Sequence, residues 1–268
     1  MKRNLIVDLP SREVNRYLRN GGDVMVVPIG SVEELGPHLP VGAKCLAAEA
    51  YAGLLAEAAG GLYLPVTPYG PAGGTSGRPG SIDLPDAAIN EYVRAVMDDL
   101  YAQGFRRIVL VTFHHYARYY LPQEFFEDHG CAAAGVHLGE VVGGDGVALD
   151  DLVLGALRIL GLDTLLARCL KLNDELVAGG KDFSIASAAA GLASGRVNVS
   201  CPVRSGEYPC PPRAGLDPAK GEEVLRRKAA ESVAALEGLR AYNEYLARRG
   251  DRGFERGSWF RGPDGEEG

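Results

Sequence analysis

The sequence lacks the features of several protein classes. Its apolar runs are much shorter than the roughly 20 residues of a membrane-spanning helix, and its N-terminal residues show no apolar segment or cleavage site typical of a signal peptide. It has no basic excess, because 28 lysines and arginines stand against 35 aspartates and glutamates, giving a net charge of −7. Such a chain is poorly suited to neutralising phosphates. We therefore expect a cytoplasmic protein that binds neither membranes nor nucleic acids.

Cysteines are few and irregularly spaced. The chain has five, and none lies in the Cys-x-x-Cys spacing of a zinc finger. Cys201 and Cys210 bracket a proline-containing loop. Two reduced thiols are the expected state there in the cytoplasm, and a disulfide is the alternative.

Strand and helix patterns alternate along the first half of the chain, which has 268 residues in all. Strands are predicted at residues 23–31, 62–70, 106–114 and 132–142, and helices at 43–60, 86–104 and 117–129. Asp86 is expected to cap its helix, and the proline of the second strand indicates an edge or a strand end. This alternation predicts an α/β fold with a mostly parallel sheet flanked by helices.

The second half of the chain is mainly helical. Helical patterns follow Gly146, a loop-rich stretch covers residues 179–217, and a long helix is predicted over 218–250. A charged, Gly-rich tail with three aromatic residues begins near residue 251, and we expect it on the surface or in a subunit contact. Without an internal repeat or a clear linker, residues 1–268 are predicted to form a single domain.

Polar side chains gather after three of the predicted strands. In parallel sheets, ligands bind beyond the carboxyl ends of the strands. The residues at these ends are Glu33, Glu34, His38 and Lys44 after the first strand, Arg78 and Ser81 in a Gly-rich loop after the second, and His114, His115 and Tyr116 after the third. Three of the five histidines therefore fall in two of these loops, which predicts a polar site at this edge of the sheet.

Several of these residues also have a purely structural interpretation. The Glu33-Glu34 pair could form a solvated turn, and His38 could be a packed loop histidine. Lys44 begins a predicted helix, where the helix dipole disfavours a cation. The Gly-rich loop matches no Walker or dinucleotide-binding fingerprint, so its sequence gives little support for phosphate binding.

The histidines differ in how they are interpreted. His114 ends a core strand, where a polar side chain must find a partner, so we interpret it as a site residue. For His115, a role in the site and a structural role are equally compatible with the sequence. His129 is expected on the surface, and His137 is expected to be structural.

Taken together, the three loops resemble the motifs of the creatininase (creatinine amidohydrolase) family of metal-dependent hydrolases. Family members carry Gly-Ser-x-Glu-Gln-His-Gly-Pro-His-Leu-Pro after a strand, and this chain has GSVEELGPHLP at residues 30–40. The family's second and third motifs are similar to GPAGGTSGRPGS at 70–81 and GFRRIVLVTFHHYA at 104–117. A segment that opens the family's last helix is similar to DPAKGEE at 217–223. The resemblance implies a three-layer creatininase-like fold, a hexamer, and hydrolysis of amide C–N bonds at two zinc or manganese ions.

Several positions depart from the family's metal-binding pattern. Glu33 and His114 stand at ligand positions, but Leu35 replaces a ligand histidine and Lys44 replaces the bridging aspartate. The second-loop Glu-His pair is Gly74-Thr75, a glutamate of creatininase is Tyr116, and HLGE at 137–140 matches a later family stretch only loosely. A lysine opposes the sharing of one ligand by two cations, and a leucine has no lone pair to offer.

The resemblance and these departures together predict a reduced or missing metal centre. We expect no ordinary binuclear site, and either no metal or one zinc or manganese ion held by Glu33 and His114 with a further group such as His115 or Glu140. Without metal, Lys44 pairs with Glu33 and fills the vacated centre.

Two functional hypotheses follow from this site. In the first, the protein is a divergent hydrolase of a small polar substrate, a cyclic amide or ring carbonyl compound. Its catalytic groups are Glu33, Lys44, His114 and His115, and its substrate contacts are Glu34, His38, Arg78, Ser81 and Tyr116. In the second, it is a non-catalytic small-molecule binder or structural subunit that keeps the fold.

Overall fold

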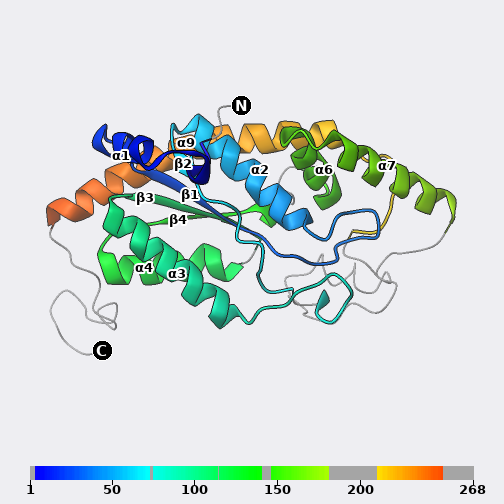
Figure 1. Ribbon diagram of the computed structural model, residues 1–268, viewed down its shortest axis with the longest axis horizontal. Coiled ribbons are helices and arrows are strands. Elements are labelled where there is room, and N and C mark those ends of the chain that lie inside the picture. The colour runs from blue at the N-terminus through cyan, green and yellow to red at the C-terminus, as the bar shows by residue number, and fades with distance from the viewer. Residues whose placement is uncertain (1–3, 73–74, 114, 141–145, 181–209, 250–268) are drawn as a thin grey trace.

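Four parallel strands form the centre of the computed structural model, which describes residues 4–72, 75–113, 115–140, 146–180 and 210–249. The strands are β1 (Val24–Ile29), β2 (Leu62–Tyr63), β3 (Arg107–Thr112) and β4 (Ala134–His137). Their order in the sheet is β2-β1-β3-β4, and every neighbouring pair is parallel (Figure 1). The predicted parallel sheet is therefore confirmed.

The register of the strands brings three chain segments out at one edge. Ile29, the last residue of β1, pairs with Thr112, the last residue of β3, and Thr112 also pairs with His137 at the end of β4. The loops that follow these strands consequently begin side by side. This is the edge at which the polar site is predicted.

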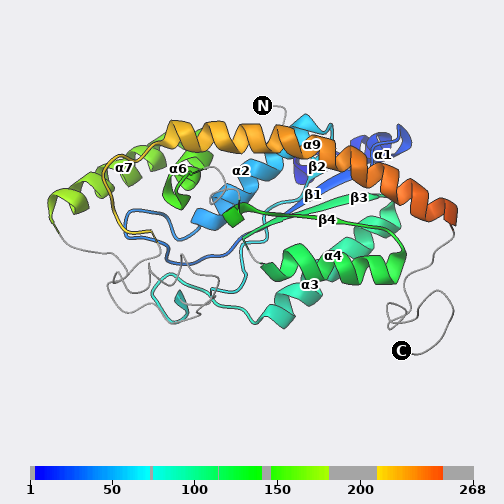
Figure 2. The same cartoon turned by 180° about the vertical axis from the view of Figure 1, so that it is seen from behind.

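Helices cover both faces of the sheet in three layers (Figures 1 and 2). One face packs against α2 (Ala43–Ala58), α6 (Leu149–Ile159) and α9 (Pro218–Arg249). The other face packs against α1 (Ser11–Arg19), α3 (Asp86–Gln103) and α4 (His115–His129). The remaining helix, α7 (Asp163–Ala178), lies beyond the sheet and packs on α6.

The strand sequences account for this layering. All residues of β1 and β3 are buried, as expected for continuous apolar strands covered on both faces. Within β1, Val24 and Val26 point to the layer of α2 and α9, whereas Met25 and Val27 point to the layer of α3 and α4. The two-residue period of a strand thus divides one apolar run between two cores.

Glycines allow α6 and α9 to touch. A Cβ at Gly221 would collide with the carbonyl oxygen of Asp151, and a Cβ at Gly155 would collide with the backbone of Gly221 and Glu222. The two helix backbones therefore meet directly at this crossing. This gives a physical reason for the glycine in the DPAKGEE segment.

The predicted elements need several corrections. The N-terminal helix α1 was not expected, because its short apolar face lies within a mostly polar sequence. Strand β2 has two residues where nine were predicted, although it does lie at the sheet edge. β4 ends at His137, and the chain then becomes helical at residues 138–140. Asp86 does not cap α3, because Pro85 holds the cap position and Asp86 is the first helical residue.

Two further findings concern the whole chain. Among the described residues, no helix has the length and apolarity needed to span a bilayer. Cys210 is a free, buried thiol among the described residues, and the alternative of a bridge to Cys201 stays a prediction. Cys201 and the tail from residue 250 lie outside the described residues.

Candidate functional site

A buried ion pair joins Glu33 and Lys44 beyond the ends of β1 and β3. Glu33 lies in the loop after β1, and its N–H donates to the carbonyl of Val41 at 2.8 Å, which folds this loop back toward α2. Lys44, in the first turn of α2, contacts Glu33 Oε1 through its ammonium group. The two side chains are only 4% and 17% exposed. The ammonium also lies 5.8 Å from the ring centroid of Phe113, which follows β3.

Two buried oxygens beside this pair lack hydrogen-bond partners among the described residues. They are Glu33 Oε2, the carboxylate oxygen that Lys44 does not contact, and Ser31 Oγ. Burying a polar atom without a partner is unfavourable by about 1–3 kcal/mol. Atoms left in this state are suited to a ligand, because a bound donor would remove the penalty.

A second ion pair joins the loop after β1 to the Gly-rich loop at residues 70–81. Arg78 Nη1 donates to Glu34 Oε2 at 3.0 Å, and the N–H of Glu34 donates to Ser81 Oγ at 3.0 Å. Glu34, Arg78 and Ser81 were each predicted to contact a substrate. The structure brings them into contact with one another, so they hold the two loops together, and their substrate contacts stay a prediction.

His38 is a buried imidazole on the far side of the same loop. Neither ring nitrogen has a hydrogen-bond partner among the described residues. Burial lowers the pKa of His38, the negative charge of Asp150 opposes this effect, and the positive charge of Arg213 adds to it. We therefore describe His38 as a neutral, buried histidine whose two ring nitrogens are unpartnered in the described part of the chain, and its contact with a substrate stays a prediction.

Arg213 is the centre of a buried charge network that the sequence did not reveal. Its guanidinium donates to both carboxylate oxygens of Asp150 at 2.8 and 2.9 Å and to Asp151 at 2.5 Å. Its backbone exchanges hydrogen bonds with the amide of Asn173 on α7. The hydrogen bonds to Asp150 raise the pKa of Arg213. Because these partners are far apart in sequence, no local spacing could have identified them.

Cys210 connects this network to the loop after β1. Its N–H donates to the carbonyl of Leu35 at 2.7 Å, and its own carbonyl leaves no room for a Cβ on Gly36. The side chain of Leu35 packs with Leu39, Val153 and Cys210 in an apolar cluster. Burial raises the pKa of the Cys210 thiol to about 12, so the group stays protonated at neutral pH. Leu35 therefore lies in a core position.

The remaining predicted residues are only partly described. His114 lies outside the described residues, as do the side chains of His115 and Tyr116 at the start of α4, so their roles stay predictions. The structural interpretation of His137 is confirmed, because its Nε2 lies 2.7 Å from the carbonyl oxygen of Phe113. His129 lies at the surface as predicted but is half-buried, with its side chain 22% exposed. Its ring packs on Tyr101 and Phe125, and its Nε2 lies 2.7 Å from Asp98.

The described residues contain no group of three or more histidine, cysteine, aspartate or glutamate side chains placed to hold a metal ion. Glu33 could ligate a metal ion through Oε2, because Oε1 already contacts Lys44. The Glu33–Lys44 pair therefore offers a carboxylate oxygen and an ammonium group at a buried strand end, an arrangement that can accept a proton and stabilise a negative oxygen.

Comparisons with known proteins point to one family. A family model described as creatinine amidohydrolase (Creatininase) matches residues 8–130. The creatinine amidohydrolase of Pseudomonas putida is 28% identical over 113 residues, which cover 40% of this chain and 44% of that protein. The mycofactocin precursor peptide peptidase of Mycolicibacterium smegmatis is 32% identical over 110 residues, covering 37% of this chain and 42% of that protein. The matches thus span less than half of these two relatives.

Solved structures extend the likeness over most of the chain. A creatinine amidohydrolase (creatininase) structure has a TM-score of 0.65 at 19% identity, covering 88% of this chain and 97% of its own. The similar creatininase structures include a Zn–Zn form and an Mn form. At this level of identity, the comparison shows a common fold.

Proposed function

Because this chain belongs to the creatininase family, we propose that it is a divergent hydrolase of a small polar substrate, a cyclic amide or ring carbonyl compound, with its two-metal centre lost or reduced. The observation that carries this proposal is the buried Glu33–Lys44 pair with its second carboxylate oxygen unpartnered among the described residues. The matched relatives are named for acting on creatinine and on a precursor peptide, both of which contain amide bonds.

A ring amide complements this pair chemically. The ring holds the carbonyl oxygen and the N–H on the same side, so one molecule presents an acceptor and a donor together. The acceptor fits the ammonium of Lys44, and the donor fits Glu33 Oε2. This match supports a cyclic amide over an open-chain trans amide, which points its two groups in opposite directions.

The proposed reaction is hydrolysis of the amide C–N bond. Lys44 donates a hydrogen bond to the carbonyl oxygen, and the Glu33 carboxylate takes a proton from the attacking water. The water oxygen bonds to the carbonyl carbon, and the C–N bond then breaks. Glu33 returns its proton to the leaving nitrogen, giving a ring-opened carboxylate and amine. His114 is the alternative base, and His115 and Tyr116 are proposed to assist proton transfer and substrate contact.

Two positions do not fit an ordinary two-metal centre. Lys44 places an ammonium group on the Glu33 oxygen that would face a shared ion, and Leu35 is held in an apolar cluster. No step of the proposed reaction therefore passes through a metal pair. The reduced centre that this proposal retains is a single zinc or manganese ion on Glu33 and His114. Hexameric self-association and a cytoplasmic location complete the proposal.

The test combines metal analysis with a substrate panel. The purified protein is assayed before and after chelation against creatinine and simple five- and six-membered cyclic amides, with its metal content measured in parallel. We expect at most one bound ion per chain, and turnover should fall by at least about 100-fold in Glu33→Gln and Lys44→Met. Lys171→Met, which removes a lysine exposed on α7, is the control and should leave turnover unchanged. Two bound ions per chain, or full activity in Lys44→Met, would refute the proposal.

The alternative is a non-catalytic binder or structural subunit. It is favoured by the apolar packing of Leu35 and by the inert thiol of Cys210 beside it, because both turn part of the family's metal region into core. The two functions differ in one measurement. A cyclic amide that raises the unfolding temperature without being hydrolysed supports the binder, whereas hydrolysis that depends on Glu33 supports the enzyme.

A further inference from the structure

The outer face of α1 carries three exposed arginines in a shallow groove of about 410 Å³. Arg12, Arg16 and Arg19 follow one another at intervals of four and three residues, so they share one side of the helix. The other side of α1 places Val14, Tyr17 and Leu18 against the sheet layer. Packing thus fixes the helix and leaves the arginine face turned to solvent.

None of the three arginines has an ion-pair or hydrogen-bond partner in the part of the chain that the structure describes. Glu13, the only carboxylate of α1, is not among the residues that line the groove. Arg12 lies in the first helical turn, where the helix dipole disfavours a cation unless an anion is near. An unbalanced positive face on a chain of net charge −7 creates a local positive potential that attracts anions.

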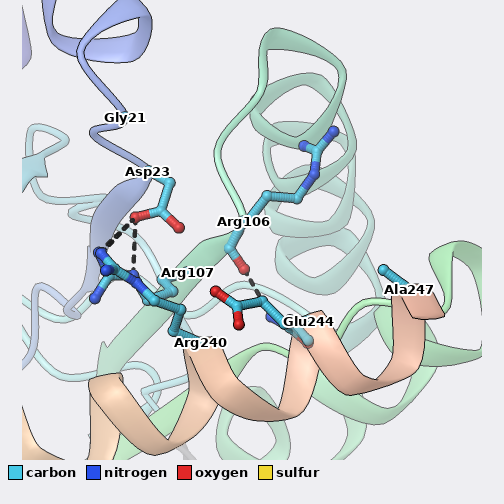
Figure 3. Close-up of a pocket in the computed structure, with 8 residues that line it drawn as sticks. Gly21, Asp23, Arg106, Arg107, Arg240, Glu244 and Ala247 are labelled. Carbon is cyan, nitrogen blue, oxygen red and sulfur yellow. Dashed lines mark hydrogen bonds and ion pairs between the residues drawn. The ribbon is translucent and has the colours of Figure 1, made fainter.

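The described chain ends beside the segment that leaves α1. Gly21 and Asp23, which follow α1, line a cavity of about 400 Å³ together with Asn243, Glu244 and Ala247 of α9 (Figure 3). Asn243 holds this part of α9 in place by donating from Nδ2 to the carbonyl oxygens of Arg106 and Ala132 at 2.9 and 3.0 Å. Residues beyond Arg249 therefore start at the same end of the molecule as α1.

The arginines around this cavity are already engaged. Arg107 contacts Asp23 at 2.5 Å, and Arg240 lies within 4 Å of the same carboxylate (Figure 3). Glu237 accepts a hydrogen bond from Arg107 at 2.8 Å and lies within 4 Å of Arg240. Arg106 stacks on the Tyr101 ring at 4.1 Å. Within the described residues, these three arginines are thus engaged by neighbouring groups, unlike the three arginines of α1.

The sequence after Arg249 supplies a matching negative charge. Asp264, Glu266 and Glu267 place three carboxylates within four positions. The extended chain from Arg249 to Asp264 can span up to about 50 Å, whereas α1 is only about 14 Å long. We propose that the acidic segment Asp264–Glu267 docks on the arginine face of α1 in the same chain.

Tethering makes such a contact effective. Exposed ion pairs are individually weak, but covalent attachment to the same chain gives the acidic segment an effective concentration on the order of millimolar at α1. The contact should also be strongly sensitive to salt, because the Debye length falls from about 30 Å at 0.01 M to about 3 Å at 1 M ionic strength.

The test uses Trp259, the only tryptophan in the chain, which lies five residues before Asp264. Its fluorescence anisotropy is followed in the full-length protein as salt is raised from 0.01 to 1 M. We expect high anisotropy at low salt and a fall toward the value of a free peptide at high salt. In the variant Arg12→Gln/Arg16→Gln/Arg19→Gln, the anisotropy should already be low at 0.01 M and should lose its salt dependence.

Two controls separate docking from a general charge effect. The variant Arg168→Gln/Arg226→Gln/Arg227→Gln removes the same charge from other helices and should behave as the parent. Exchanging charges, with Arg16→Glu/Arg19→Glu combined with Glu266→Arg/Glu267→Arg, should restore the salt-dependent anisotropy that either pair alone abolishes. Unchanged anisotropy in the α1 variant would overturn the proposal. A salt-dependent signal that vanishes on dilution would overturn it too, because it would indicate docking between chains.

Discussion

At the scale of single residues, Lys44 determines how Glu33 is used. In a two-metal centre, a glutamate at this position would face an ion, whereas here one of its oxygens contacts an ammonium group and the other is buried without a partner among the described residues. A carboxylate this deeply buried needs a compensating positive charge. Lys44 provides that charge from within the chain, since its ammonium group contacts Glu33 Oε1.

His38 should make the fold sensitive to acid. Its folded-state pKa lies below the ordinary value of 6.5, so below that pH the unfolded chain binds more protons than the native one. The stabilising contribution of the neutral histidine is therefore fully present above pH 6.5 and is lost as the pH falls through the folded-state pKa. In His38→Gln, the decrease in unfolding free energy between pH 6.5 and 5 should be smaller than in the parent.

Urea unfolding at several pH values tests this expectation. Asp150 and Arg213 are the charged groups that influence His38, and both are retained in the variant, so the comparison isolates the imidazole. Above pH 7.5 the two proteins should show parallel pH dependence. Equal slopes of stability against pH below 6.5 would show that His38 is not the responsible group.

At the scale of elements, the contact between α6 and α9 depends on one missing side chain. Gly221→Ala would push a Cβ into the Asp151 backbone, which also carries part of the Arg213 network. Overpacking of this kind destabilises proteins by about 1–3 kcal/mol. We expect a loss of that size in the free energy of unfolding, accompanied by a weaker anchoring of the loop that contains Cys210.

Gly238 offers a matched control in the same helix, because a Cβ there would meet open space. Gly238→Ala should leave the fold intact and raise its stability by up to about 1 kcal/mol, since alanine favours the helix and restricts the unfolded chain. Chemical denaturation gives the free energy of unfolding of each variant. Equal free energies of unfolding for Gly221→Ala and Gly238→Ala would mean that α6 and α9 separate easily and that their close crossing is not required.

At the scale of the whole molecule, the sheet separates two candidate surfaces. The Glu33–Lys44 pair lies beyond the carboxyl end of β1, and the arginine face of α1 lies before its amino end. The six residues of β1 put about 20 Å between these edges. This separation exceeds the Debye length of about 8 Å at physiological salt, so charges on α1 should have little effect on the Glu33–Lys44 pair. We therefore expect the arginine variant of α1 to change the anisotropy of Trp259 and to leave cyclic-amide turnover within about 2-fold of the parent. A large change in turnover would indicate that the two surfaces are coupled.

Sequence patterns were sufficient for the features that depend on local order. The continuous apolar runs of β1 and β3, their alternation with helices, and the grouping of Glu33 and Lys44 at a strand end follow from short-range periodicity and from the geometry of parallel sheets. The pairing of Lys44 with Glu33 was predicted from the resemblance, because Lys44 stands where the family has its bridging aspartate.

Only the tertiary structure decided which polar residues serve the fold. Glu34 and Arg78 are far apart in sequence, yet they join two loops. Arg213 contacts Asp150, which lies 63 positions earlier in the chain. His129 is packed in the α3–α4 layer although its sequence environment is polar. Long-range contacts of this kind depend on how the layers stack, and a one-dimensional pattern does not contain that information because each partner's neighbours in sequence are different from its neighbours in space.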